Sequence, residues 1–143
     1  MANREEMLRR CPDVAFSISA TLSIFNALHL PDLHRELAEK GYANHDAFAL
    51  NMLVFPEMYR MQVLPPAFKE RVLESYRRHR ESFLDADAAA ARDFAAAARS
   101  LQAQDCSELL PGFVAMTRRL DQLRGEDCRE VFPELAELFE AVA

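Results

Sequence analysis

The feature that most constrains the fold is an alternation of apolar and hydroxyl side chains over residues 14–26. Every second position is apolar, from Phe16 to Ile24. The positions between them are Ser17, Ser19, Thr21 and Ser23. Successive side chains of a strand point to opposite faces, so this pattern predicts a β-strand with one apolar and one hydroxyl face. The hydroxyl face is expected either to meet solvent or to line a polar cavity.

A helix and a second strand follow this segment. The helix is predicted to begin at Leu30, with Pro31 near its first position, and to end at Gly41. The apolar run over residues 46–55 predicts a more buried strand, which Pro56 ends. A strand, a helix and a strand in this order predict two parallel strands joined by a crossover helix, a β-α-β unit.

The rest of the chain shows helical periodicity and no strand pattern. Helices are predicted from Pro65 to Phe83, from a cap at Asp85 or Asp87 to about Gln104, from about Pro111 to Arg124, and across Leu135, Leu138 and Phe139. The predicted fold class is therefore α/β and helix-dominated, in a single domain over residues 1–143. Its β-α-β part occupies residues 14–64, and a bundle of about four helices forms the tail over residues 65–143.

The composition limits the classes of partner. Half of the 143 residues are hydrophobic and 28% are charged, which is typical of a globular protein. The net charge of -6 argues against nucleic acid or an anionic membrane as a partner, because both attract clustered Lys and Arg. The basic cluster over residues 77–80 is interpreted as the solvated face of a helix. The sequence shows no signal-peptide pattern and no bilayer-length apolar run, so a cytoplasmic location is expected.

The sequence contains no complete catalytic or metal-binding motif. Its cysteines, Cys11, Cys106 and Cys128, are widely spaced and are expected to be free thiols of a reducing compartment. His29 and His34 lie five positions apart, which does not place them on one helix face. The three glycines form no phosphate-binding loop, and no G-x-S-x-G elbow presents a serine nucleophile. The chain is therefore expected not to be catalytic alone.

A polar amide interrupts the second predicted strand. Asn51 shares a face with Ala49 and Leu53, so the pattern predicts a buried amide among apolar neighbours. A buried amide requires hydrogen-bond partners, which a ligand or a neighbouring strand would supply. Asn51 is therefore a candidate binding residue.

Three stretches, in this order along the chain, resemble the carboxy-terminal part of radical S-adenosylmethionine proteins of the twitch-domain type. They are TLSIFNALHLPDL (residues 21–33), ALNMLVFPEMYRMQVLPPAFKERV (residues 49–72) and LLPGFVAMTRRLDQLRGEDCREVFPEL (residues 109–135). Such proteins carry a similar strand and helix, then a strand with an Asn followed by a helix that starts at Leu-Pro. Their tail ends with L-D-x-x-R and V-F-P-E-like segments. The correspondence extends over residues 14–139.

The resemblance implies a partial (β/α) barrel. In the family, three cysteines hold a four-iron four-sulfur cluster, and S-adenosylmethionine binds the remaining iron. Reductive cleavage of S-adenosylmethionine yields an adenosyl radical, so the chemistry belongs to the cofactors. The cluster loop, C-x-x-x-C-x-x-C, does not occur in this sequence and is expected upstream of residue 1. The chain would supply late barrel strands and a helical cap, and it is expected to bind no cofactor alone.

The resemblance also suggests binding residues. In such a barrel the hydroxyl face of the first strand would face the lumen, where cofactor and substrate lie. Ser23 and Asn26, near the carboxyl end of that strand, then become candidate cofactor-binding residues, and Asn51 would reach the cavity from the second strand. No catalytic residue and no metal ligand is assigned.

Two functions remain open. In the first, the chain is a fragment or subunit of a radical S-adenosylmethionine enzyme, and an upstream cluster-binding half or a partner chain completes it. The chain would then be a piece of a longer protein or one of two subunits. In the second, the chain is a non-catalytic interaction module derived from that fold. Pairing of its edge strands would then produce a homo-oligomer.

Overall fold

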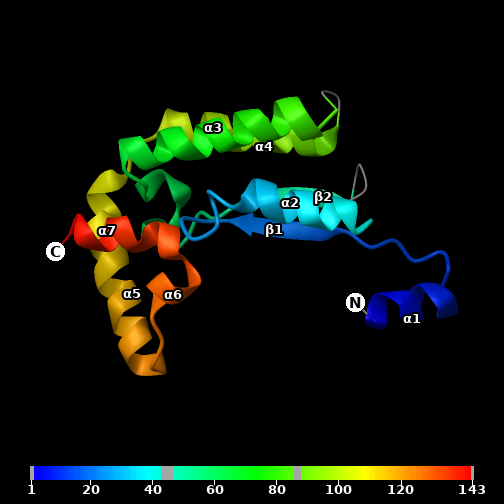
Figure 1. Cartoon of the computed structure of the whole chain (residues 1–143), viewed down its shortest axis with the longest axis horizontal. Helices are drawn as coiled ribbons and strands as arrows, with labels where there is room; N and C mark the ends of the chain where they lie inside the picture. The colour runs from blue at the N-terminus through cyan, green and yellow to red at the C-terminus, as the bar shows by residue number, and fades with distance from the viewer. Residues whose placement is uncertain (1, 43–46, 86–87, 143) are drawn as a thin grey trace.

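The computed structural model describes residues 2–42, 47–85 and 88–142. Within them the chain forms a helix-dominated α/β fold with seven α-helices and one two-stranded parallel sheet (Figure 1). The helices are α1 (Ala2–Arg10), α2 (Leu30–Glu39), α3 (Pro66–Phe83), α4 (Ala89–Ala103), α5 (Leu110–Arg124), α6 (Cys128–Val131) and α7 (Ala136–Glu140). The strands are β1 (Ile18–Leu22) and β2 (Phe48–Met52).

The predicted β-α-β unit is confirmed. The two strands run parallel, with Ile18 opposite Phe48 and Leu22 opposite Met52, and α2 joins them. Each strand is shorter than the segment whose sequence pattern predicted it, since only five residues of each strand pair in the ladder. Gly41 follows α2 with a φ of 71°, a left-handed conformation that favours glycine at the end of a helix. Asp46, where the second strand was predicted to begin, lies outside the described residues.

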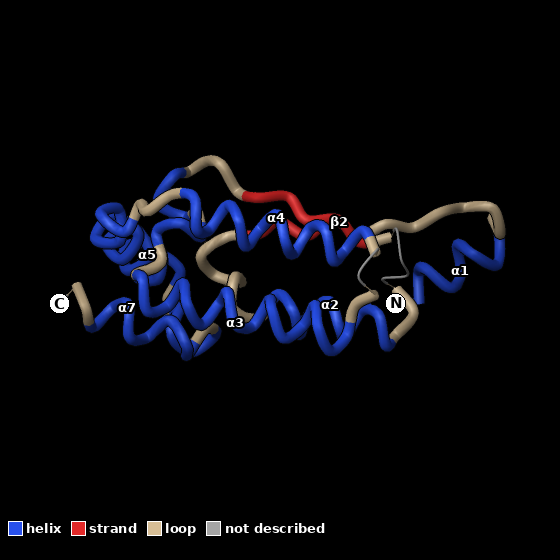
Figure 2. Tube along the Cα trace, turned by 90° about the horizontal axis from the view of Figure 1, so that it is seen from above, coloured by secondary structure: helices blue, strands red, loops and turns tan. Residues whose placement is uncertain are grey.

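One continuous core connects the sheet with the helices. The apolar face of the sheet contributes Leu22 and Phe48. The largest buried side chains of the tail include Tyr76 of α3, Phe94 of α4 and Phe113 of α5. Figure 2 shows α4 running along β2 and α3 running beside α2. Burial of each such side chain stabilises the fold by roughly 1.5–3 kcal/mol relative to its exposure.

The helical tail differs from the predicted bundle in several details. Ala88 precedes α4 without a side-chain cap, so the cap predicted at Asp85 is wrong, and Asp87 lies outside the described residues. Leu123 has the helical spacing of the apolar residues of α5, such as Phe113 and Leu120, yet 75% of it is exposed. The last predicted helix is divided between a 3-10 turn, Pro133–Leu135, and α7. Short 3-10 turns also occupy Glu57–Tyr59, Met61–Val63 and Ser107–Leu109.

The amino-terminal helix α1 was not predicted. It stands apart from the other helices, at the end of the sheet remote from α5 (Figure 1). The guanidinium of Arg4, in this helix, lies over the rings of Phe16 and Tyr42, 5.5 and 4.9 Å from their centroids. Met7 is 49% exposed, so this helix has no continuous apolar stripe from which periodicity could predict it.

None of the helices in the described part of the chain combines the length and the apolar character that a bilayer crossing requires.

Candidate functional site

The hydroxyl face of the sheet faces solvent. Ser17, Ser19 and Thr21 are exposed, whereas Leu22 on the opposite face is buried. The predicted division of this strand into an apolar and a polar face is therefore confirmed. The same face continues onto β2, where Ala49 is exposed. Of the two environments left open for the hydroxyl face, the described residues provide the solvent-exposed one.

Asn51 lies on this exposed face. Its side-chain amide donates a hydrogen bond to Ser19 Oγ on the neighbouring strand. The prediction of a buried amide is wrong, because none of the described helices covers this side of the sheet and the apolar neighbour Ala49 is exposed as well. Of the two partners expected for the amide, the adjacent strand supplies one, through Ser19 Oγ.

The backbone of β1 divides its hydrogen-bonding groups between two edges. Ile18 N donates to Ala47 O at 2.6 Å, and Leu53 N donates to Leu22 O at 2.9 Å. In a parallel pair, alternate residues of a strand bond to the same neighbour. The backbone N–H and C=O groups of the even-numbered residues of β1 therefore point toward β2. Those of Ser19 and Thr21 point toward the outer edge of the sheet.

The side chain of Asn26 closes the carboxyl end of that outer edge. Asn26 Oδ1 accepts a hydrogen bond from Ser23 N at 2.9 Å, and Asn26 Nδ2 donates to Thr21 O at 2.9 Å. A primary amide that both accepts and donates in this way replaces the peptide group of a neighbouring strand. Ser23 Oγ also lies 3.4 Å from Asn26 Oδ1. The sequence predicted cofactor contacts for both residues, and the structure gives them a shared role in ending the strand.

The other edge of the sheet is closed by α4. Leu50 N, on the outer side of β2, donates to Asp93 Oδ2 at 3.0 Å. The sheet therefore has one edge capped by a helix and one edge, along Ser17 to Thr21, that the described residues leave without a strand partner. Of the three predicted binding residues, Ser23 and Asn26 are brought together at the end of this open edge. Asn51 lies across from Thr21 in the strand register.

A buried histidine pair is a feature that the sequence did not predict. His79 Nε2 of α3 lies 3.1 Å from His34 Nδ1 of α2, and the two side chains are almost fully buried. Burial, His34 and Arg35 lower the pKa of His79 to about 4, and burial lowers the pKa of His34. Both rings are therefore neutral at pH 7. The helical spacing of His79 with the apolar residues of α3 indicated that its side chain could be buried. Nothing in the sequence indicated that His34 would be its partner.

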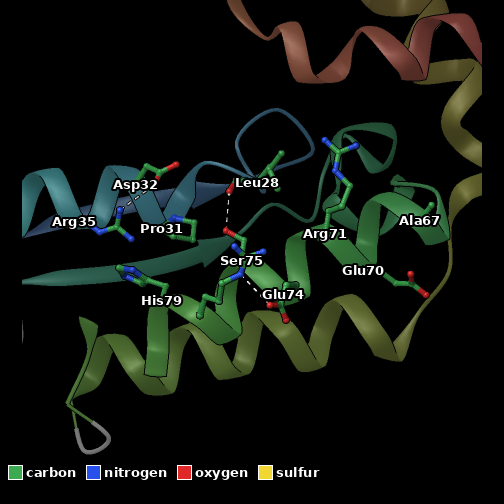
Figure 3. A pocket seen from close by; sticks show the side chains of 11 residues that line it. Leu28, Pro31, Asp32, Arg35, Ala67, Glu70, Arg71, Glu74, Ser75 and His79 are labelled. Atoms are coloured by element: carbon green, nitrogen blue, oxygen red, sulfur yellow. Dashed lines mark hydrogen bonds and ion pairs between the residues drawn. The ribbon is translucent and has the colours of Figure 1, made fainter. Parts of the chain in front are cut away.

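A groove of about 580 Å³ lies beside this pair, between α2 and α3 (Figure 3). Its lining carries three carboxylates and three guanidinium groups, and four of these form ion pairs within the groove: Arg35 with Asp32, at 3.5 Å, and Arg78 with Glu74, at 3.0 Å. Of residues 77–80, the three arginines are exposed as the interpretation of a solvated helix face requires, whereas His79 is buried, which that interpretation did not foresee. The balance of charge in the groove leaves no excess to attract an ionic ligand.

The cysteines do not form a metal site. Cys11 is exposed, and Cys106 and Cys128 are buried free thiols. Burial, followed by the carboxylates near it, raises the pKa of Cys128 to about 11, so this thiol is protonated at neutral pH and is a poor metal ligand. Across the described ranges, no three His, Cys, Asp or Glu side chains converge as metal ligands. The cysteines of the described residues therefore present no set of converging thiolates for an iron-sulfur cluster.

The chain was compared with protein-family models, curated proteins and solved structures, and none of them matches it.

Proposed function

We propose that this chain is the carboxy-terminal portion or subunit of a radical S-adenosylmethionine enzyme. It would contribute the late strands of a partial (β/α) barrel and a helical cap, while an upstream half or a partner chain would supply the cluster. S-adenosylmethionine cleavage would then require both parts, and this chain would be inactive alone.

The open edge of β1 carries the proposal. The backbone N–H groups of Ser19 and Thr21 face away from β2, so a further parallel strand could bond to them without disturbing the existing ladder. Asn26 marks where such a strand would have to end, because its amide already occupies Thr21 O and Ser23 N. An added strand would extend the sheet on the side where a preceding barrel strand belongs.

The faces of the sheet agree with the same proposal. In a (β/α) barrel the helices cover the outer face of the sheet, and the inner face lines the lumen. Here the apolar face packs against helices, and the exposed face carries Ser19, Thr21 and Asn51. Addition of the missing strands would enclose this polar face. Ser23, Asn26 and Asn51 then remain the proposed cofactor-facing residues, near the carboxyl ends of the two strands.

The proposal is tested by reconstitution. The chain is mixed anaerobically with a candidate half that carries C-x-x-x-C-x-x-C, together with iron, sulfide and S-adenosylmethionine. We expect a stable complex by size-exclusion chromatography with light scattering, and 5′-deoxyadenosine by liquid chromatography. The absence of both association and cleavage with every candidate half would contradict the proposal.

A pair of variants at Ser19 tests the edge itself. Ser19→Pro removes the outward N–H but no hydrogen bond to β2, so it should abolish complex formation with little loss of stability. Ser19→Ala removes only the hydroxyl that accepts from Asn51 and should still form the complex. If Ser19→Pro, folded by circular dichroism, associates as well as Ser19→Ala, the added strand does not pair at β1.

An alternative function is a self-associating module without chemistry. The observation that favours it is the exposure of Val54, at 72%, and Phe55, at 80%, directly after β2. Two copies would pair through their β1 edges, and these side chains offer further apolar surface for association. Light scattering should then show a dimer at high protein concentration, and a strict monomer would exclude this version.

A further inference from the structure

A second cavity lies between α5, α6 and the loop after β1. It measures about 400 Å³. The cavity forms because α5 ends at Gly125, whose φ of 67° turns the chain so that α6 begins at Cys128. Phe25, from the loop after β1, closes the third side. The size is in the usual range for sites that bind small molecules.

The walls of the cavity are aromatic and aliphatic. The rings of Phe25 and Phe132 lie 5.5 Å apart between centroids and are tilted by 42°. Leu120 of α5 and Val131 of α6 complete the apolar lining, and Val131 is 69% exposed at the surface. Contacts of Phe25 with Tyr59 and Phe113 hold its ring against the core. The apolar wall is therefore formed before any ligand arrives.

The rim of the cavity carries three carboxylates, those of Asp121, Glu126 and Asp127. Asp121 Oδ2 accepts a hydrogen bond from Cys128 N at 3.0 Å, and Asp127 pairs with Arg129 at 2.6 Å. Glu126 is exposed and makes no ion pair with any residue that the structure describes.

The local electrostatic potential is negative. After burial, the carboxylates of Asp121 and Asp127 are the next causes that raise the pKa of Cys128, which lies inside the cavity. The guanidinium of Arg124 also lines the cavity, so the lining carries three carboxylates and one guanidinium. A bound group near Cys128 therefore meets negative charge.

We propose that this cavity binds a small, flat organic cation, such as an arylalkylamine, with its ring packed against Phe25 and Phe132 and its ammonium group toward Asp121 and Glu126. Aromatic faces and carboxylates both attract cations, and an apolar ring would displace water from the lining. The site is formed entirely by this chain, so it does not depend on the enzyme proposed above.

The test compares three indole probes that differ in charge: tryptamine as the cation, 3-ethylindole as the neutral form and indole-3-propionate as the anion. The chain contains no tryptophan, so indole fluorescence reports the probe alone. We expect tryptamine to bind most tightly and indole-3-propionate most weakly. Equal or tighter binding of the anion, or no binding of any probe, would overturn the proposal.

Variants locate the site. The double variant Asp121→Asn and Glu126→Gln keeps the hydrogen-bonding atoms but removes both charges, and it should weaken tryptamine binding about five- to tenfold without affecting 3-ethylindole. Val131→Arg introduces a cation at the mouth and should abolish tryptamine binding. Leu123→Arg is the matched control, because Leu123 is equally exposed on α5 but does not line the cavity. If Leu123→Arg and Val131→Arg act alike, the probe binds elsewhere.

Discussion

The buried histidine pair should make the stability of this protein depend on pH, and replacement of His79 should remove most of that dependence. His79 is neutral in the folded chain, with a pKa of about 4, whereas a solvated histidine in the unfolded chain has a pKa near 6.5. Between these values the unfolded chain binds more protons than the folded chain. The free energy of unfolding therefore rises with pH across this window and falls as the pH is lowered through it.

The magnitude follows from the two pKa values. One proton of difference corresponds to about 1.4 kcal/mol per pH unit, so the full window between pH 6.5 and 4 amounts to about 3 kcal/mol. The titratable and charged groups that act on His79 are His34, Arg35 and Asp32, and all three belong to α2. Protonation of His34 at low pH would further lower the free energy of unfolding, because burial also lowers the pKa of this residue.

The assay is urea denaturation followed by far-ultraviolet circular dichroism at a series of pH values between 4 and 7.5. His79→Phe keeps a buried ring but cannot take up a proton. At pH 7 it should cost about 1 kcal/mol, through the lost hydrogen bond to His34. At pH 4.5 this difference in unfolding free energy should disappear or reverse. At that pH the unfolded wild-type chain is stabilised by protonation of His79, whereas the variant has no histidine at this position to protonate.

The control is His29→Gln, which removes a half-exposed histidine instead. This variant should retain the pH dependence that the buried pair produces. If His79→Phe shows the same slope of unfolding free energy against pH as the wild-type chain, the pair does not titrate as its burial implies, and the reasoning is refuted.

Two further predictions concern Asn26 and the thiols. Asn26→Ala should lower the free energy of unfolding by about 1–2 kcal/mol, because Ser23 N and Thr21 O lose their partner, whereas Asn51→Ala on the exposed face should change it by less than about 0.5 kcal/mol. Equal effects in urea denaturation would show that Asn26 does not hold the strand end. In folded protein at pH 8, Cys11 should react rapidly with a disulfide reagent and Cys128 much more slowly, since Cys128 is buried and its pKa is about 11. Mass spectrometry of the labelled peptides distinguishes them, and comparable rates would contradict the burial of Cys128.

The local order of the chain was predictable because it depends on neighbours in sequence. Alternation over residues 14–26 gives β1 its two faces, and the structure keeps the hydroxyl groups on the exposed side. Pro31 at the start of α2 and the glycines at 41 and 125 mark helix ends through backbone geometry alone, which requires no knowledge of the fold. The parallel arrangement follows from the order of strand, helix and strand.

The surroundings of each side chain were decided by tertiary structure. Whether Asn51 is buried depends on whether a helix covers its face of the sheet, and among the described residues none does. Leu123 has the spacing of a core residue, but none of the described elements buries that side of α5.

The polar contacts that define the sites are the least visible in the sequence. His34 and His79 meet although 45 positions separate them, because α2 and α3 pack together. The cavity beside Cys128 exists only where α5, α6 and Phe25 converge. Even at the alternating segment, the sequence determined which side chains face outward. Only the packed chain determined that α4 closes one edge of the sheet, through Asp93, and that no described strand pairs with β1 at the other edge. Strand pairing and capping are contacts between distant segments, whose partners no local pattern specifies.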